Sequence, residues 1–231
     1  MIDWQQFWEN QAKHQDELRQ VARTLNNQTL SESQLKEHVA LMVDCLGLTG
    51  KQVLLDVCCG NGMVTRLLAE HTKKTIGLDF SSKLIEHAKL QANHIVYEQA
   101  DVTKLFDWPH YEAYFKRLDA VTMCFSFQYF NTVEKGFTVI SQLVPLLKHG
   151  GHILLTDVPE RSQFFSYYNS IPKVLSLIKQ MATGANLMGK FWAEDELAFI
   201  CNENGLMGKK IKQPQHFPYA GYRMDYLITK P

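Results

Sequence analysis

The sequence predicts an α/β protein with a doubly wound, mostly parallel sheet of seven strands, an antiparallel last strand and an N-terminal helical extension. Two observations predict this fold. Between residues 51 and 158, short apolar strands alternate with amphipathic helices, as in parallel sheets that helices cover on both faces. Near the C-terminus, the loop between the last two strands is too short for a crossover helix, so the final strand is expected to run antiparallel.

Five strands and three helices make up the alternating part. The expected strands are 52–57, 75–80, 95–99, 118–125 and 152–158, and the expected helices are 62–71, 81–92 and 133–147. Ser81 is placed to cap the second of these helices, because a serine side chain accepts from the free N–H groups of the first turn. Residues 51–158 therefore form the core of the fold.

Residues 1–50 are expected to form a helical cap. A first helix over 3–25 carries three aromatic residues on one side, and two asparagines break it. These residues are Trp4, Phe7, Trp8, Asn26 and Asn27. A second helix begins after Ser31, which forms a capping box with Gln34, and it ends at Gly47.

The chain after residue 158 departs from the alternation. Residues 159–192 form an aromatic insertion, and residues 193–231 form a helix and a strand hairpin with strands at 209–212 and 222–229. No repeat or low-complexity segment separates these parts, so the 231 residues are expected to be a single domain.

The composition excludes several classes of function. Lys+Arg and Asp+Glu are equal at 24 each, so no net charge draws the chain toward nucleic acid or an anionic membrane. No apolar run has the length of a membrane span, and the start has no signal-peptide pattern. The five cysteines are odd in number and mostly lie in apolar segments, which indicates reduced thiols in a cytoplasmic protein without a zinc site.

Candidate binding residues follow the strands of the predicted parallel sheet, because such sheets bind ligands at the carboxyl ends of their strands. The strand ends offer Asp56 with Cys58–Gly62, Asp79, Asp101, Cys124 with Phe125, and Thr156 with Asp157. Gly60 and Gly62 allow the backbone to approach a ligand. Asp79 is placed to accept from a ribose diol, and Asp101 is placed to accept from the amine of adenine, with Val102 on the ring.

A dinucleotide is the rival ligand. Its fingerprint needs a third glycine three residues after the second, where Thr65 stands here, and Asp56 brings a negative charge close to the expected pyrophosphate. The sequence also lacks the Tyr-x-x-x-Lys pair of short-chain dehydrogenases. A cationic adenosine derivative fits the acidic strand ends better.

The stretch VLLDVCCGNG at residues 53–62 resembles motif I of the class I S-adenosylmethionine (AdoMet) methyltransferases, commonly LDxGCGxG. Cys58 replaces the first glycine of that motif. GLDFS with Asp79 and QADV with Asp101 resemble the next two motifs, and GGHILLTD resembles the strand after the usual double glycine. The resemblance covers about residues 50–160 and implies a Rossmann-like methyltransferase fold of the bacterial small-molecule type.

The resemblance also implies roles for individual residues. Asp56 and the backbone of Cys58, Cys59, Gly60, Asn61 and Gly62 would hold the cationic methionine end of AdoMet. Asp79, followed by Phe80, would take the ribose hydroxyls, Asp101 and Val102 would contact adenine, and Cys124 with Phe125 would line the site near the methyl group. Helix capping and turn formation are alternative roles for Asp79 and Asp101.

Methyl transfer from a sulfonium needs no metal, but a hydroxyl acceptor needs a base. Six histidines are expected away from the site: His71, His149 and His152 at the wrong edge of the sheet, and His38, His87 and His94 on solvated surface. The loop before the last strand is predicted to touch the acceptor through His216, Tyr219, Tyr222 or Arg223, with a solvated loop as the alternative.

The N-terminal helix, with Arg23, and the aromatic insertion are candidate lids, although such aromatic stripes are usually core. Deleting residues 1–25 is therefore predicted to weaken AdoMet binding. The expected partner is a small-molecule acceptor methylated on oxygen, with no nucleic acid or membrane, by a monomer or homodimer. A catalytically silent AdoMet-binding scaffold and, less favoured, an NAD(P)-dependent oxidoreductase stay open as alternatives.

Overall fold

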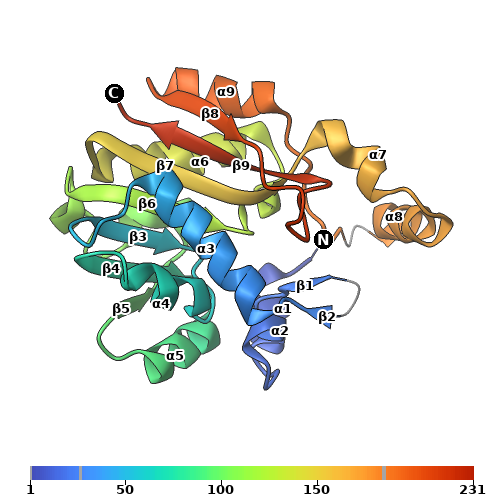
Figure 1. Ribbon diagram of the computed structural model, residues 1–231, viewed down its shortest axis with the longest axis horizontal. Helices are drawn as coiled ribbons and strands as arrows, with labels where there is room; N and C mark the ends of the chain where they lie inside the picture. Colours follow the sequence, from blue (N-terminus) through green and yellow to red (C-terminus); the bar gives the residue numbers. More distant parts are fainter. Residues whose placement is uncertain (1, 26–27, 184–185) are drawn as a thin grey trace.

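The computed structural model describes residues 2–25, 28–183 and 186–231. A seven-stranded sheet with the order β5-β4-β3-β6-β7-β9-β8 runs through the molecule (Figure 1). Its strands are β3 (Val53–Val57), β4 (Lys74–Asp79), β5 (Val96–Gln99), β6 (Leu118–Cys124), β7 (Leu147–Pro159), β8 (Met207–Ile211) and β9 (Arg223–Thr229). The first five pair in parallel, and β9 is antiparallel to both of its neighbours. The predicted fold class is confirmed.

Helices cover both faces of this sheet, because successive strand residues point to opposite sides. Leu54 packs into a cluster with α3 (Glu32–Leu46) and α4 (Met63–Ala69) on one face. Its neighbour Leu55 packs into the larger cluster on the other face, with α6 (Val133–Leu143) and α9 (Glu194–Glu203). The helix α5 (Ser82–Gln91) packs beside β4 and β5. Both faces of the central strands are therefore buried, which explains their continuous apolar sequences.

The helices begin and end where their capping residues stand. Ser31 and Gln34 form the predicted capping box of α3, and Gly47 ends that helix in the left-handed region with φ 59°. The Ser81 hydroxyl accepts from the N–H of Leu84 and caps α5.

The predicted length of the first helix is wrong. Instead of one helix over 3–25, the chain forms α1 (Trp4–Gln11), α2 (Glu17–Gln20) and a short strand β1 (Thr24–Leu25) that pairs with β2 (Gln28–Thr29). The Asp16 carboxylate accepts from the N–H groups of Leu18 and Arg19 and so starts a new helix instead of continuing the old one. The predicted break at Asn26 and Asn27 lies outside the described residues.

The aromatic insertion lies beyond the end of the sheet (Figure 1). It contains the 3-10 helix η5 (Arg161–Gln163) and the helices α7 (Phe164–Tyr167) and α8 (Ile171–Thr183). Other 3-10 helices are η1 (Val102–Asp107), η2 (Glu112–Tyr114), η3 (Phe127–Tyr129) and η4 (Val144–Leu146). None of the described helices combines the length and apolar character that crossing a bilayer requires.

Candidate active site

A cavity of about 450 Å³ opens at the carboxyl ends of the parallel strands. The strand order reverses between β3 and β6, and ligands of open α/β sheets bind at such a switch point. Most of the predicted cofactor residues line this cavity: Asp56, Cys58, Cys59, Gly60, Asn61, Asp79, Phe80, Asp101, Val102, Cys124 and Phe125. Gly62 is not one of the lining residues. The sheet therefore gathers residues that are up to 69 positions apart around one space.

Asp56 is a buried carboxylate held by two hydroxyl groups. Its Oδ2 accepts from Thr65 Oγ1 at 2.6 Å, and its Oδ1 accepts from Thr122 Oγ1 at 2.8 Å. Burial raises the pKa of Asp56 to about 6, although the two hydroxyl groups oppose that shift. A cationic ligand in the cavity would offset the desolvation and favour the ionised form.

The loop after β3 brings bare backbone to the cavity. Cys58, Gly60 and Gly62 have φ angles of 57°, 58° and 75°. A Cβ atom on Gly60 would lie 2.7 Å from Cγ1 of Val21, and one on Gly62 would lie 2.5 Å from the Tyr97 hydroxyl. Glycine is thus required twice for space as well as for conformation, whereas Cys58 adopts the same left-handed region at a cost of about 1 kcal/mol.

Asp79 lies at the end of β4 and fixes that loop. Its Oδ2 accepts from the N–H of Gly60 at 2.9 Å, and its Oδ1 accepts from the N–H of Ser81 at 2.9 Å. Burial raises the pKa of Asp79 to about 6. A carboxylate has about four lone-pair directions, so two stay free for a ligand diol.

Asp101 occupies a different environment at the end of β5. Its Oδ1 accepts from the backbone and hydroxyl of Thr103 in a turn at the start of η1, and the side chain is exposed. The turn-forming role weighed from the sequence is therefore present. It leaves Oδ2 free, so turn formation and ligand binding are compatible at this residue.

The side-chain nitrogen and oxygen of Asn61 form hydrogen bonds with other protein groups and not with the cavity. Its Nδ2 donates to the main-chain oxygen of Glu17 and to Oε1 of Gln20, both at 2.9 Å, and its Oδ1 accepts from Met63 N–H. Arg66 pairs with Glu17 beside it. The Asn61 side chain thus anchors the N-terminal segment onto the loop after β3. The position of Asn61 in the sequence motif did not predict this role.

Comparison with known proteins agrees with this geometry. Residues 54–151 match the family described as "Methyltransferase domain". A ubiquinone biosynthesis O-methyltransferase of Vibrio cholerae is 28% identical over 183 residues, which span 77% of this chain and 70% of that protein. The corresponding enzyme of Nitrosomonas europaea is 25% identical over 173 residues, or 73% and 69% of the two chains. The chain is an S-adenosylmethionine-dependent methyltransferase that resembles the class I enzymes.

Two solved structures share the fold of this methyltransferase. The N-methyltransferase NodS from Bradyrhizobium japonicum, in complex with S-adenosyl-L-homocysteine (AdoHcy), has a TM-score of 0.67 at 17% identity over 100% of both chains. The magnesium protoporphyrin IX methyltransferase of Synechocystis, with bound AdoHcy, has a TM-score of 0.62 at 16% identity, over 99% of this chain and 95% of that one. Both comparisons extend the match beyond the cofactor half to the terminal elements.

The N-terminal segment of the methyltransferase closes one side of the cavity. Trp4, Trp8, Val21 and Arg23 are lining residues. Trp4 and Trp8 contact the ring of Tyr129, with centroids 4.4 and 5.9 Å apart. The N-terminal segment thus lies where a lid would exclude water, and its role as a lid stays a prediction.

The double substitution Trp4→Ala with Trp8→Ala is expected to weaken AdoHcy binding about five- to 150-fold, because it removes two aromatic contacts that contribute about 0.5–1.5 kcal/mol each. Calorimetric titration measures the change. Phe165→Ala, in α7 with 82% exposure, is the matched control and should leave binding unchanged. These variants test the lid more specifically than deleting residues 1–25 does, because the deletion also removes Arg23. Equal affinity in all three proteins would reject the lid.

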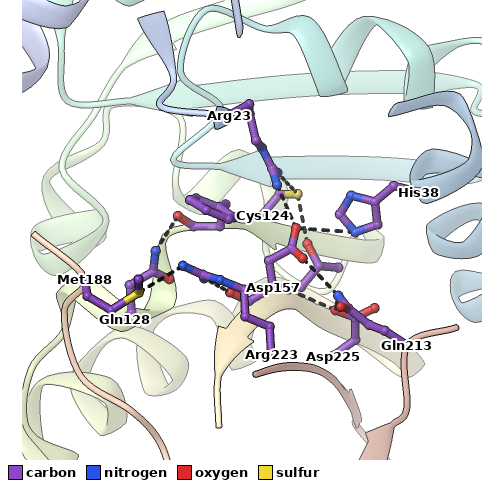
Figure 2. A network of polar contacts seen from close by, with 11 residues as sticks. Arg23, His38, Cys124, Gln128, Asp157, Met188, Gln213, Arg223 and Asp225 are labelled. Carbon is purple, nitrogen blue, oxygen red and sulfur yellow. Dashed lines mark hydrogen bonds and ion pairs between the residues drawn. The ribbon is translucent and has the colours of Figure 1, made fainter. Parts of the chain in front are cut away.

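A buried polar network lies next to the lid (Figure 2). Nη1 of Arg23 donates to Oδ2 of Asp157 at 2.7 Å, and Nη2 contacts Sγ of Cys124 at 2.6 Å. His38 Nε2 lies 3.6 Å from the same Asp157 oxygen. Burial lowers the pKa of His38, although the charge of Asp157 opposes that shift. The expectation of a solvated His38 was wrong, because α3 turns this residue toward the sheet.

Asp157 is the centre of that network. Burial disfavours its ionised form, but His38 and then Arg23 hold its pKa well below the usual range. Gln213 Nε2 also donates to Oδ1 of Asp157 and to Oδ1 of Asp225. His38, Gln213 and Asp225 were not identified as site residues from the sequence. The only sequence feature that could have indicated them as site residues is that each is a polar residue in an apolar segment or a loop.

The residues predicted to touch the acceptor are placed differently from one another. His216 is exposed, and its Nε2 lies 2.5 Å from Oε1 of Glu37 on α3. Arg223 is buried with its Cζ 4.0 Å from the Phe125 ring centroid, while Tyr219 and Tyr222 lie against the same guanidinium. None of the four lines the main cavity. Arg223 approaches it through Phe125, whereas His216 stays a prediction without such a contact.

Proposed function

We propose that this methyltransferase transfers the methyl group of AdoMet to an oxygen of a small-molecule acceptor by in-line displacement. The observation that carries the proposal is the cavity between the acidic ends of β3, β4 and β5 and the aromatic lid. AdoMet would supply a methyl group on a positively charged sulfonium. The cofactor half of the cavity is acidic and the other half is aromatic, which suits one cationic and one apolar reactant.

Each acidic residue has a separate proposed role. Asp79 would accept from the ribose hydroxyls through its free lone pairs, and Asp56 would favour the cationic methionine end by charge. Asp101 would accept from the adenine amine, beside Val102. The loop from Cys58 to Gly62, together with Phe80, would form the floor under the nucleoside.

The acceptor would lie on the other side, against Cys124, Phe125 and Tyr129. The relatives in Vibrio cholerae and Nitrosomonas europaea are named O-methyltransferases, which supports oxygen as the attacked atom. The chain contributes by orienting the two reactants and excluding water, and such alignment lowers a barrier by up to about 7–11 kcal/mol. No histidine is among the described residues that line the main cavity.

Radiolabelled methyl transfer tests the proposal. The protein is incubated with [methyl-³H]AdoMet and a small-molecule extract of cells, and labelled products are separated by size. We expect label in the small-molecule fraction and none in protein or nucleic acid. Label confined to macromolecules would contradict the small-molecule acceptor, and no transfer at all would favour the silent scaffold.

Thermal unfolding separates the cofactor alternatives in the same preparation. AdoHcy at about 100 times its dissociation constant should add about 2.7 kcal/mol of stability, whereas NAD should add none. Stabilisation by NAD alone would instead favour the oxidoreductase. The carboxylate of Asp56 close to the loop makes that outcome unexpected, because it would repel a pyrophosphate.

A further inference from the structure

Arg223 is a buried cation without an ion pair to any described carboxylate. Its side chain is on the first residue of β9, and the residue is 4% exposed. Its Nη1 donates to the main-chain oxygen of Asp157, and its Nη2 lies 3.4 Å from Sδ of Met188, which is a weak acceptor. Its Nε has no hydrogen-bond partner. Buried charges are normally paired, so this guanidinium lacks an anion.

The neighbouring carboxylates form no direct ion pair with Arg223, although the charge of Asp157 acts on it from a distance. Asp157 is already engaged by Arg23 and Gln213. Asp225 accepts from the N–H of Asp157 and from Gln213, and burial, followed by the charge of Asp157, raises its pKa to about 7. The cluster therefore holds two guanidinium groups against one fully ionised carboxylate, with at most a partial second charge.

Arg223 lines neither cavity, but it contacts Phe125, which lines the main one. Arg23 and Arg223 both contact the ring of Phe125, with Cζ 4.5 and 4.0 Å from its centroid, and Phe125 lines the main cavity. The second cavity, of about 330 Å³, shares two lining residues with the first, Trp4 and Tyr129. The guanidinium of Arg223 points toward Gln128 and Met188 (Figure 2).

Further unpartnered polar atoms lie around this guanidinium. Gln128 lines the second cavity, and its Oε1 is buried without a partner. The hydroxyl of Tyr219, whose ring lies against Arg223, is also without a partner. Buried polar groups are rarely left unsatisfied, so their concentration here indicates a place for a polar ligand group.

We propose that Arg223 binds an anionic oxygen of the methyl acceptor. This inference rests on the proposed function and names the acceptor's chemical class. The anion is either a carboxylate beside the methylated position or the attacked hydroxyl in its ionised form. In the second case, the anionic oxygen forms the new O–CH₃ bond while the S–CH₃ bond breaks and its electron pair stays on sulfur. No proton then has to be removed in that step, which agrees with a main cavity whose described lining contains no histidine.

Calorimetric titration of the AdoHcy-saturated protein tests this inference with three probes. These probes are benzoate, 4-nitrophenol above its pKa, and uncharged benzamide. We expect at least one anion to bind more tightly than benzamide. Arg223→Met should weaken anion binding about ten- to a hundredfold, since hydrogen bonds to charged groups contribute that much. Arg223→Lys should retain part of the affinity and guards against a folding defect.

Arg161→Met is the control, because Arg161 is a surface residue that pairs with Asp195 and Glu196. It should bind the anions as the wild type does. Tight benzoate binding assigns a carboxylate-bearing acceptor, and tight 4-nitrophenolate binding assigns the ionised hydroxyl. Equal affinity for benzamide and both anions, or unchanged anion binding in Arg223→Met, would overturn the inference. Failure of AdoHcy to bind would instead count against the proposed function.

Discussion

Replacing Asp79 by asparagine is expected to weaken AdoHcy binding about 30- to 1,000-fold. Asparagine keeps one oxygen for the ribose, so the substitution removes one charge-assisted hydrogen bond, which contributes about 1.5–3 kcal/mol, and weakens the other by about 0.5–1 kcal/mol. It also places an amide NH₂ against the N–H of either Gly60 or Ser81, because both carboxylate oxygens now accept from backbone. The loss should therefore appear in cofactor affinity before it appears in the acceptor's KM. Calorimetric titration with AdoHcy measures it.

Asp101→Asn is the matched control for that experiment. Asp101 is exposed at the start of η1, and an asparagine oxygen can still accept from Thr103. We expect a loss of about tenfold or less, because one exposed hydrogen bond contributes about 1 kcal/mol. If Asp79→Asn kept wild-type affinity while melting normally, the ribose role of Asp79 would be wrong. If both variants lost affinity equally, the burial of Asp79 would not make its contribution to AdoHcy binding larger than that of Asp101.

The cofactor half of the cavity could be predicted because its determinants are local. Asp56, Asp79 and Asp101 each stand at or just after the end of their own strand, and parallel strands bring such ends to one edge. The alternation of strands and helices is therefore sufficient to place them together. The same locality explains why Ser31 and Ser81 correctly predicted the starts of two helices.

The acceptor half could not be predicted in this way. Arg23 and Asp157 form their ion pair across 134 positions of sequence, and Gln213 reaches Asp157 across 56. No periodicity encodes such contacts, and a histidine in α3 has the same sequence pattern whether it faces solvent or sheet. Asn61 shows the same limit within a motif, since its amide is directed at α2 by tertiary packing. The break of the first helix depended on a single side chain, Asp16, which competes for backbone N–H groups.

Arg23→Met is expected to lower the free energy of unfolding by about 3–5 kcal/mol at pH 7, because it leaves the buried charge of Asp157 without its closest partner. Urea unfolding followed by circular dichroism measures the loss. The double variant Arg23→Met with Asp157→Asn removes both charges, and we expect it to recover most of the stability. Asparagine keeps an oxygen for Gln213, so that hydrogen bond survives. A double variant as unstable as the sum of the single ones would mean that the two residues are not coupled.

The pH dependence gives the same pair a second, independent signature. In the wild type the pKa of Asp157 is depressed, so its contribution is present above the unfolded value of about 3.9 and is lost as the pH falls toward the folded value. Without Arg23 that depression is reduced, so the variant's deficit should stay constant from pH 7 to about pH 4 and shrink only as the pH falls below about 4. A deficit that does not shrink below pH 4 would mean that Arg23 stabilises the fold by packing on Phe125 and not by its charge.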